Sequence, residues 1–472
     1  MATKSVGAGG SRATLARFLR PVPSVTERLA AGKALRGKVP RASLATLQPP
    51  PRRKDPVEIL EAQAKTRLAE LIPVRYARML TSPFAFLRGS AAVMAQDLSS
   101  SPVTGLTVQA CGDMHLANFG VFASAERNLV FGINDFDETL PGPWEWDLKR
   151  LVASIVVALR FLGGDRVVQE AAARSAVSSY RERLREFSEM GYLQLHYATI
   201  KDRDVLASLS PETRQRAEVL FAKSRKRGHL QVLDKMTSLV DDKQRIIEEA
   251  PLIVRETRTQ QGTPIIKAVG DVLERYLASL PLDRQVLVSK YRLVDVARKV
   301  VGVGSVGTRC WVVLLLGASE VDPLFLQFKE AQASVLAPYF AGQNFKNEGR
   351  RVVEGQRLIQ GAPDIFLGWG EIEGVDFYFR QLRDMKGSVE FDPENWRPKG
   401  MQEYAGLCGW ALALAHAKSG DAAMLAGYVG KNEVLDDALG AFGFAYADQT
   451  DRDFEGLKKA AREKRIPVAS RF

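Results

Sequence analysis

The sequence predicts an α+β protein with two parts, one mainly helical and one rich in β-strands. From Asp55 onward, apolar residues recur at three- and four-residue spacing, which is typical of amphipathic helices. From about Tyr291, short apolar runs alternate with turn residues, which is typical of strands. The helical pattern returns near Met401. The β-rich part is therefore expected between two helical stretches of the chain.

These changes of pattern divide the chain into four segments. We expect a basic, disordered tail, a helical part, a β-rich part and C-terminal helices that pack back on the helical part, with bounds 1–54, 55–290, 291–390 and 391–472. The tail holds 12 Lys or Arg and one acid, Glu27, and so accounts for the whole net charge of +11. The rest of the chain is neutral, with 54 basic and 54 acidic residues.

This charge distribution bears on the partners of the protein. Nucleic-acid-binding folds carry their basic residues on the folded body, so specific nucleic-acid binding is not expected. The tail could contact an acidic partner or a membrane surface, and its composition also resembles a transit peptide. The longest apolar runs are too short to span a bilayer, and no apolar N-terminal segment suggests secretion. Three widely spaced cysteines indicate neither a disulfide framework nor a zinc site, so we expect a cytoplasmic location.

Individual elements follow from local periodicity and turn residues. Helices are expected at 146–162 and 404–418. Strands are expected at 106–110, 130–133, 300–303, 310–316, 324–329, 365–369 and 377–381. Residues 111–118 are expected to form a loop between the first two strands, and this loop carries the first set of candidate site residues.

Asp113 and Asn118 stand with four residues between them in this loop. This is the spacing of the kinase catalytic loop, in which the Asp accepts the proton of the attacking hydroxyl and the Asn holds a metal ion. His115 is a further candidate at the catalytic position, although a hydrogen bond that orders the loop is the simpler role. Cys111 is expected to be a small buried residue rather than a nucleophile.

Asp135 and Asp137 follow an apolar strand, 17 residues after Asn118. Carboxylates at a strand end are suitable ligands for Mg²⁺, and two of them could serve two metal ions. The strand, Gly-Asp loop, second strand and Asp-Phe-Asp together have the layout of small-molecule kinases of the aminoglycoside and choline type. Asp147, at the start of an apolar helix, is expected to brace the catalytic loop rather than bind a ligand.

A glycine-rich segment lies far downstream, between two predicted strands. Gly302, Gly304, Ser305 and Gly307 belong to a Gly-x-Gly-x-x-Gly sequence, in which backbone N–H groups can approach phosphate oxygens closely. A dinucleotide-binding turn would lead into a helix. Here a strand follows, which is the arrangement of the protein-kinase hairpin that covers the phosphates.

The strand after this hairpin ends in Lys329, where kinases carry the lysine that pairs with the α- and β-phosphates. Glu354, on the following helix, is the best candidate for the acid that holds this lysine, and Glu348 and Glu330 are alternatives. Gln381 and Arg383 then occupy the place of the hinge that contacts adenine.

Glycine loop, lysine, helix and hinge have the order of a kinase small lobe, but they follow Asp113 and Asp135 instead of preceding them. A circular permutation explains this order, because chain ends lie at the surface and often close together. The predicted fold is therefore a two-lobed, protein-kinase-like fold, circularly permuted.

Several long stretches of the sequence resemble one bacterial family, domain of unknown function 2252. The similarity is carried by residues 82–89, 111–120, 134–147, 301–309 and 446–452. This resemblance implies membership of a family grouped with kinase-like folds, but it implies no substrate.

The activity expected from these residues is phosphoryl transfer from ATP, with Mg²⁺, to a small-molecule acceptor. Only eleven residues separate Asp135 from Asp147, too few for the segment that docks peptide substrates in protein kinases. Two alternatives stay open, nucleotidyl transfer on the same fold and a nucleotide-binding regulator without catalysis. The second is disfavoured because Asp113, Asn118 and Lys329 are all present together with Asp135.

Overall fold

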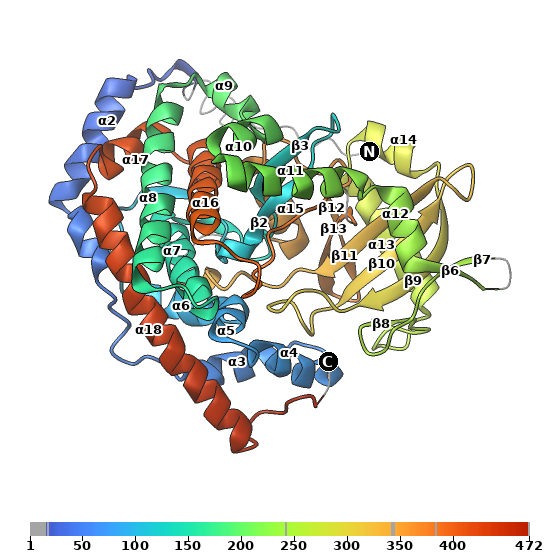
Figure 1. Cartoon of the computed structure of the whole chain (residues 1–472). Helices are drawn as coiled ribbons and strands as arrows, with labels where there is room; N and C mark the ends of the chain where they lie inside the picture. Colours follow the sequence, from blue (N-terminus) through green and yellow to red (C-terminus); the bar gives the residue numbers. More distant parts are fainter. Residues whose placement is uncertain (1–15, 17, 241–242, 341–344, 383–384, 471–472) are drawn as a thin grey trace.

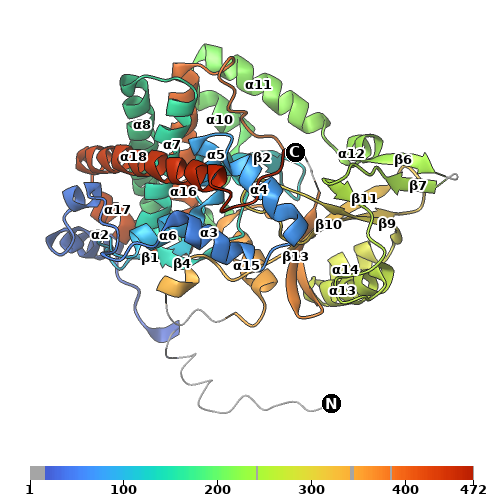
Figure 2. The same ribbon diagram turned by 90° about the horizontal axis from the view of Figure 1, so that it is seen from below.

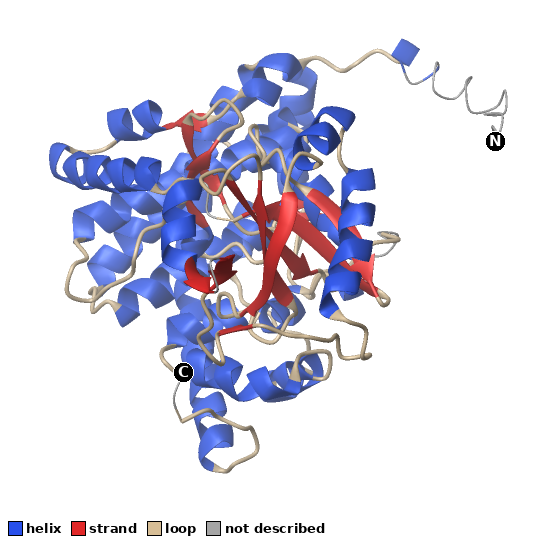
Figure 3. Cartoon of the chain, turned by 90° about the vertical axis from the view of Figure 1, so that its right-hand side faces the viewer, coloured by secondary structure: helices blue, strands red, loops and turns tan. Residues whose placement is uncertain are grey.

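The computed structural model describes residues 16, 18–240, 243–340, 345–382 and 385–470. Helices gather on one side of the molecule, and a six-stranded antiparallel sheet lies on the other (Figure 1). Figure 3 shows the same division with helices and strands in separate colours. The predicted α+β class is confirmed.

The helical side is built around α7 (Trp144–Phe161). Its residues from Leu148 to Leu159 are all buried, because α8, α16 and α18 pack around it. The stretch from Leu151 to Leu159 is apolar on all faces except at Ser154, and such a stretch requires burial on every side. The other helices on this side are α3 (Pro56–Ala64), α4 (Ile72–Met79), α5 (Pro83–Gly89), α6 (Ala91–Leu98), α8 (Arg166–Glu189), α9 (Tyr192–Tyr197), α10 (Asp202–Ser208), α11 (Pro211–Lys226), α16 (Pro398–Ser419), α17 (Ala422–Val429) and α18 (Val434–Arg462).

Two small sheets lie among these helices and carry the loops of the candidate site. β1 (Thr107–Ala110) pairs with β4 (Leu140–Pro143), and β2 (Phe119–Ala123) pairs with β3 (Leu129–Ile133), which also pairs with β5 (Ile200–Lys201). The sequence predicted β1 and β3. It missed β2 and β4, whose glycines and prolines weaken the strand pattern.

The large sheet has the strand order β12-β13-β11-β10-β9-β8. Its strands are β8 (Ile253–Val254), β9 (Arg292–Lys299), β10 (Cys310–Leu316), β11 (Pro323–Glu330), β12 (Gly368–Ile372) and β13 (Val375–Gln381). α15 (Glu348–Ile359) connects β11 to β12. The strand predicted at 300–303 is wrong, because these residues belong to the turn between β9 and β10.

The boundary of the β-rich part lies earlier than residue 291. α13 (Ile265–Ser279) places Val269, Val272 and Tyr276 against the sheet, and β8 adds a strand to it. α14 (Leu282–Val288) joins the same core, while α12 (His229–Met236), β6 (Thr237–Val240) and β7 (Lys243–Ile246) cover the other face. The segment 229–290 therefore belongs to the sheet and not to the helical part, because its apolar faces are buried there.

The basic tail is also shorter than expected. Ser24 caps α2 (Val25–Ala34), and this helix packs closely on α17, where a Cβ at Gly32 would lie 2.0 Å from the carbonyl oxygen of Met424. Leu44 is fully buried. A disordered tail through residue 54 is therefore wrong from Ser24 onward. Within the described residues, no helix has the length and apolar character needed to cross a membrane.

Candidate functional site

The two predicted sets of site residues border one cleft, although they are far apart in the sequence. Five residues on its helical side were predicted, namely Asp113, His115, Asn118, Asp135 and Asp137. Three residues on its sheet side were also predicted, namely Gly302, Gly304 and Ser305. The cleft has a volume of about 100 Å³, and we call it the central cleft. α3, α4 and α5 lie near the junction of the two parts and contribute to its wall (Figure 2).

Asp147 holds the start of the loop at residues 111–118, as the sequence predicted. Its two carboxylate oxygens accept hydrogen bonds from the backbone N–H groups of Cys111, at 2.6 Å, and Gly112, at 2.9 Å. His416 lies 3.3 Å from the same carboxylate and is in turn bonded to Tyr180. A carboxylate that accepts two buried N–H groups fixes the backbone and places Asp113 next to the cleft.

Asp113 is paired with a residue that the sequence analysis did not identify. Its Oδ1 accepts a hydrogen bond from Nε of Arg150, on α7, at 2.6 Å. Burial raises the pKa of Asp113 above its ordinary value, although Arg150 opposes the shift. A carboxyl group with a raised pKa is a better proton acceptor in catalysis than an ordinary one.

His115 lies beside Asp113 and is buried. Its Nε2 is 3.8 Å from Oδ2 of Asp113, and its Nδ1 has no hydrogen-bond partner among the described residues. Burial lowers the pKa of His115 well below its ordinary value, so its ring is neutral. At this distance the ring makes no hydrogen bond to Asp113, so the structure shows that His115 lies near this carboxylate but does not show the loop-ordering bond.

Asn118 connects the catalytic loop to the strand that precedes Asp135. Its side-chain Nδ2 donates to the carbonyl oxygen of Asp113 at 2.6 Å, and its own carbonyl accepts from the N–H of Asn134 at 2.9 Å. Since Nδ2 is used in this way, the amide oxygen Oδ1 of Asn118 is the side-chain atom that is suited to binding a metal ion. Asp135 makes no ion pair with another described residue and accepts only from the N–H of Asp137, at 3.3 Å.

Lys329 and Asp137 form an ion pair at the edge of the central cleft. The ammonium also donates to Oγ of Ser305 at 2.6 Å, and the hydroxyl of Tyr378 donates to Asp137 at 2.7 Å. Burial would raise the pKa of Asp137, but Lys329 and these hydrogen bonds hold it below its ordinary value. Burial would lower the pKa of Lys329, but Asp137 raises it. Both groups are therefore charged at neutral pH.

The glycine loop, residues 300–309, is held against the helices that line the cleft. Gly302 and Gly307 have φ angles of 65° and 90°, which favour glycine. The carbonyl of Gly302 accepts from Arg78 at 2.5 Å, and that of Gly307 accepts from the N–H of Leu68 at 2.8 Å. A Cβ at Gly304 would lie 3.1 Å from the carbonyl oxygen of Arg88, so a larger residue would crowd this contact.

The prediction that Glu354 holds Lys329 is wrong. Glu354 lies on the exposed side of α15, where it pairs with Arg350 at 2.7 Å. The two alternative acids also have other partners, since Glu348 pairs with Arg351 and Glu330 with Arg309. The spacing of an acid along a helix does not determine which face of that helix meets the neighbouring strand.

The side of α15 that faces the site carries Arg351 instead. This buried arginine donates to the carbonyl oxygens of Thr139 at 2.6 Å and Asp137 at 2.9 Å. It also donates to the carbonyl of Gln332 at 2.7 Å. Through these bonds α15 fixes the loop that carries Asp137. Asp137 itself, and no acid of α15, forms the ion pair with Lys329.

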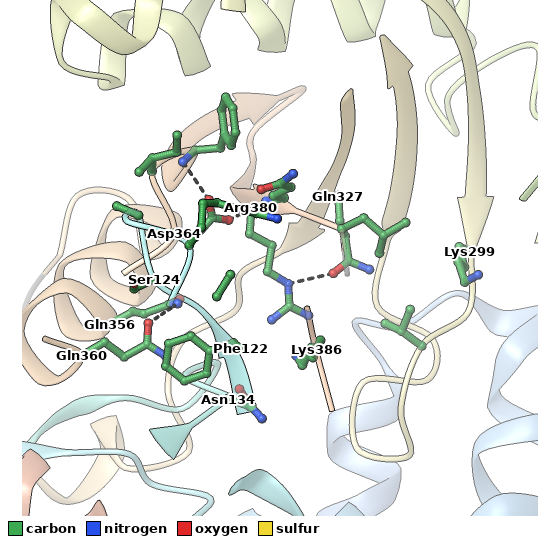
Figure 4. Close-up of a pocket in the computed structure, with 18 residues that line it drawn as sticks. Phe122, Ser124, Asn134, Lys299, Gln327, Gln356, Gln360, Asp364, Arg380 and Lys386 are labelled. Carbon is green, nitrogen blue, oxygen red and sulfur yellow. Dashed lines mark hydrogen bonds between the residues drawn. The ribbon is translucent and has the colours of Figure 1, made fainter. Parts of the chain in front are cut away.

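A larger cavity of about 400 Å³ lies beside the sheet, and Figure 4 shows the residues that line it. Gln381 is among them, but its backbone N–H already donates to Asp364 at 2.5 Å. The N–H of Leu382 donates to the carbonyl of Phe325. These two N–H groups are therefore not free for an adenine, contrary to the prediction for the hinge. Arg383, the other predicted hinge residue, lies outside the described residues.

Polar side chains fill the centre of this cavity. Arg380 donates to Oε1 of Gln327 at 2.9 Å, a bond drawn in Figure 4, and Gln360 donates to the carbonyl of Ile133 at 2.7 Å. Gln356, from α15, and Phe122, from β2, line the same space. The volume is within the range of small-ligand sites, which combine apolar walls with a few polar groups.

The candidate metal ligands fit Mg²⁺ by their chemistry. Among the described residues, no group of three or more His, Cys, Asp and Glu side chains is arranged to hold a metal ion. Asn118, Asp135 and Asp137 offer one amide and two carboxylates at one cleft, which are the oxygen donors that Mg²⁺ prefers. Mg²⁺ usually takes only one or two protein carboxylates and completes its shell with phosphate oxygens and water.

Sequence reasoning missed five residues at the site: Arg67, Arg75, Arg88, Arg150 and Tyr378. Arg67, Arg75 and Arg88 line the central cleft, and the other two bind its carboxylates. The stretch 82–89, which includes Arg88, was noticed only for its resemblance to a family. Arginines on helices are common, and no spacing rule links them to a distant loop.

The fold and the site define an α+β protein with a charged cleft between a helical part and an antiparallel sheet. The chain belongs to the bacterial family described as "uncharacterized protein conserved in bacteria", domain of unknown function 2252, whose profile matches residues 67–460. Searches of curated proteins and of solved structures found no match.

Proposed function

We propose that this protein is a Mg²⁺-dependent phosphotransferase with a circularly permuted, kinase-like fold, which transfers the γ-phosphoryl group of ATP to a small-molecule acceptor. The observation that carries the proposal is the contact of Lys329 with both Asp137 and Ser305. It joins the strand lysine, the acid loop and the glycine loop at one point. Asp113, the candidate base, borders the same central cleft.

The order of elements in the sheet supports the kinase-like part of this proposal. A β9–β10 hairpin carries the glycine loop, β11 carries the lysine, and α15 connects β11 to β12, while β13 returns beside β11. This is the order of parts expected of a kinase small lobe. The catalytic loop and the Asp-Phe-Asp segment come from the preceding helical part, which is the reason for proposing a permutation.

The residues then take the following roles. The glycine loop and Lys329 bind the phosphates, and the cavity of about 400 Å³ takes the base and sugar. Asn118, Asp135 and Asp137 hold Mg²⁺, which neutralises the phosphate charge when bound. The acceptor oxygen forms a bond to the γ-phosphorus as the bond from that phosphorus to the bridging oxygen breaks. ADP leaves with the electron pair, and the hydroxyl proton passes to Asp113.

The site departs from the kinase pattern at one position. In kinases a glutamate of the helix holds the lysine, whereas here the acid is Asp137, a proposed metal ligand. Binding of Mg²⁺ and nucleotide would therefore exchange this ion pair for contacts to phosphate and metal. A small-molecule acceptor fits the short connection from Asp135 to Asp147, which leaves no long segment to dock a peptide.

Nucleotide binding gives the first test. We expect ATP with Mg²⁺ to raise the melting temperature of the parent protein and of Lys459→Ala, a control at an exposed lysine. Lys329→Ala and Asp135→Ala should show no such shift. Equal shifts in all four proteins would contradict the assignment of the site.

The position of a radioactive label gives the second test. Incubation with γ-labelled ATP should transfer the label to the acceptor, and incubation with α-labelled ATP should not. Transfer of the α label would indicate nucleotidyl transfer instead. Binding without any transfer, and without effect of Asp113→Ala, would indicate a regulator.

A further inference from the structure

Three arginines line one wall of the central cleft: Arg67 before α4, Arg75 on α4 and Arg88 on α5. We call them the arginine cluster. Arg75 is fully buried, and the other two are partly buried. The Nε atom of each is buried and has no hydrogen-bond partner among the described residues. Guanidinium groups in protein interiors are normally paired with carboxylates or fully hydrogen-bonded, because burying an unpaired charge costs free energy.

None of the three makes an ion pair with a described residue. Arg67 donates to the carbonyl of Val306 at 2.5 Å. Arg75 donates to Oε1 of Gln63 at 2.9 Å and more weakly to two carbonyl oxygens. The side chain of Arg88 makes no hydrogen bond to a described residue, and its guanidinium lies 5.8 Å from the ring centre of Phe84. Burial lowers the pKa of all three, that of Arg75 to about 9.

Other cations near the cleft form ion pairs with acids, whereas the arginines of this wall form none with a described residue. Arg150 is paired with Asp113, Arg309 with Glu330, and Lys329 with Asp137. These pairs use three of the acids that line the cleft. Acids of the cleft also attract Arg67 and Arg88 electrostatically, but they form no ion pair with them, so N–H groups of the arginine cluster are available for a ligand.

We propose that the arginine cluster is a subsite for an anionic group, a phosphate or a carboxylate, carried by the acceptor. The inference rests on the proposed function, because it names the chemistry of the acceptor. The cluster shares the cleft with Asp113, the residue placed at the attacking hydroxyl, and with His115 beside it. Arginine forms two parallel hydrogen bonds with planar or tetrahedral oxyanions, so this wall would orient the acceptor for attack.

The anionic group could belong to the acceptor or could be the terminal phosphate of the nucleotide. Competition between inorganic phosphate and a nucleotide analogue distinguishes these two cases. Inorganic phosphate is titrated calorimetrically into the full chain at low ionic strength, without and with a saturating non-hydrolysable ATP analogue and Mg²⁺. We expect binding in both states, because the acceptor subsite is separate from the site of the triphosphate. Phosphate binding that disappears when the analogue is bound would assign the cluster to the nucleotide and overturn the inference.

Substitution of single arginines then tests whether the phosphate binds at the arginine cluster. Arg88→Gln should weaken phosphate binding by about tenfold, the loss of one charge-assisted hydrogen bond, and should leave the affinity for the analogue unchanged. Arg452→Gln removes one exposed arginine on α18 and should bind phosphate like the parent. Arg67→Gln provides a second variant of the cluster, and a melting curve of each protein shows whether it is folded.

The two proposals fail in different ways. If the parent binds no phosphate, or if folded Arg88→Gln and Arg67→Gln bind it as tightly as the parent, the anion subsite is wrong. If phosphate binds through Arg88 but the nucleotide analogue does not bind at all, the anion site is supported and the phosphotransferase assignment fails.

Discussion

The ammonium of Lys329 and the carboxylate of Asp137 form an ion pair across 192 positions of the sequence. Lys329 lies on the third strand from one edge of the large sheet, and Asp137 follows a strand of the helical part. The pair therefore holds the two parts of the molecule together at the proposed phosphate site. The same two groups are the proposed ligands of phosphate and Mg²⁺. The stability of the fold and the binding of the nucleotide therefore depend on the same residues.

The first prediction concerns the stability that this pair provides. Lys329→Met leaves the half-buried carboxylate of Asp137 without its cation, and we expect a loss of about 3 kcal/mol in the free energy of unfolding. Adding Asp137→Asn should recover part of this loss, because the unpaired charge is removed. Urea unfolding of the two single variants and the double variant measures the coupling. The exposed pair of Arg350 and Glu354 is the control, with an expected coupling of about 0.5 kcal/mol.

The second prediction separates binding from turnover at Asp113. Asp113→Asn should keep the affinity for ATP and Mg²⁺, because this carboxylate is not among the proposed ligands of the phosphates or of Mg²⁺. Loss of a general base should reduce kcat by about 100-fold or more. Calorimetry gives the affinity, and transfer of the γ label gives the rate, with Asp448→Asn as an exposed control. Unchanged transfer in Asp113→Asn would assign the proton acceptor to another residue.

The third prediction concerns the support of the catalytic loop. Asp147→Asn presents an NH₂ group to one of the two backbone N–H groups that the carboxylate now binds. Losing a buried, charge-assisted hydrogen bond should lower the free energy of unfolding by about 1–3 kcal/mol. The midpoint of urea unfolding tests this. A variant as stable as the parent would show that the carboxylate does not brace the loop.

The fourth prediction is a pH dependence that arises away from the site, at Lys149 on α7. Lys149 is fully buried, its Nζ has no hydrogen-bond partner among the described residues, and it lies 4.5 Å from the ring centre of Phe442. Burial lowers its pKa to about 8 from the ordinary 10.5, although Glu145 opposes the shift. Between these two values the unfolded chain binds more protons than the folded chain, so this residue makes stability rise with pH.

Lys149→Met should therefore stabilise the protein at pH 7, by at most about 3 kcal/mol for a shift of this size. The gain should shrink as the pH rises above about 8 and vanish only well above 10.5, where the lysine is neutral in both the folded and the unfolded state. Urea unfolding at pH 7 and pH 10 measures both effects, with the exposed Lys459→Met as control. A variant that is less stable than the parent at pH 7 would show that the contact with Phe442 outweighs the cost of burial.

Much of the local structure could be predicted because periodicity and turn residues act within a few positions. β10 spans Cys310–Leu316, as predicted, and β1, β3, β11 and β13 overlap the expected strands. The helix expected at 146–162 is α7, shifted by two residues or fewer at each end. Asp147 was predicted to brace the loop from the likeness of its segment to that of small-molecule kinases, and its carboxylate does bind the backbone of Cys111 and Gly112.

The errors concern which elements pack together. α13 has an apolar face, but nothing in its sequence pattern shows that this face covers the sheet rather than the helical part. Glu354 has a suitable spacing from Lys329 but faces solvent, whereas Arg351, on the same helix, faces the site. Such choices depend on how helices rotate when their apolar surfaces are buried, and no local rule contains this information.

The sequence by itself determined the two groups of chemically capable residues, an acidic loop and a glycine- and lysine-bearing hairpin, together with the α+β class. Only the tertiary structure decided that Asp137 holds Lys329 and that the arginine cluster forms a wall of the central cleft without acidic partners. The physical reason is that residue types and spacings express short-range preferences. Ion pairing and burial depend instead on distances between segments that come together only when the chain is folded.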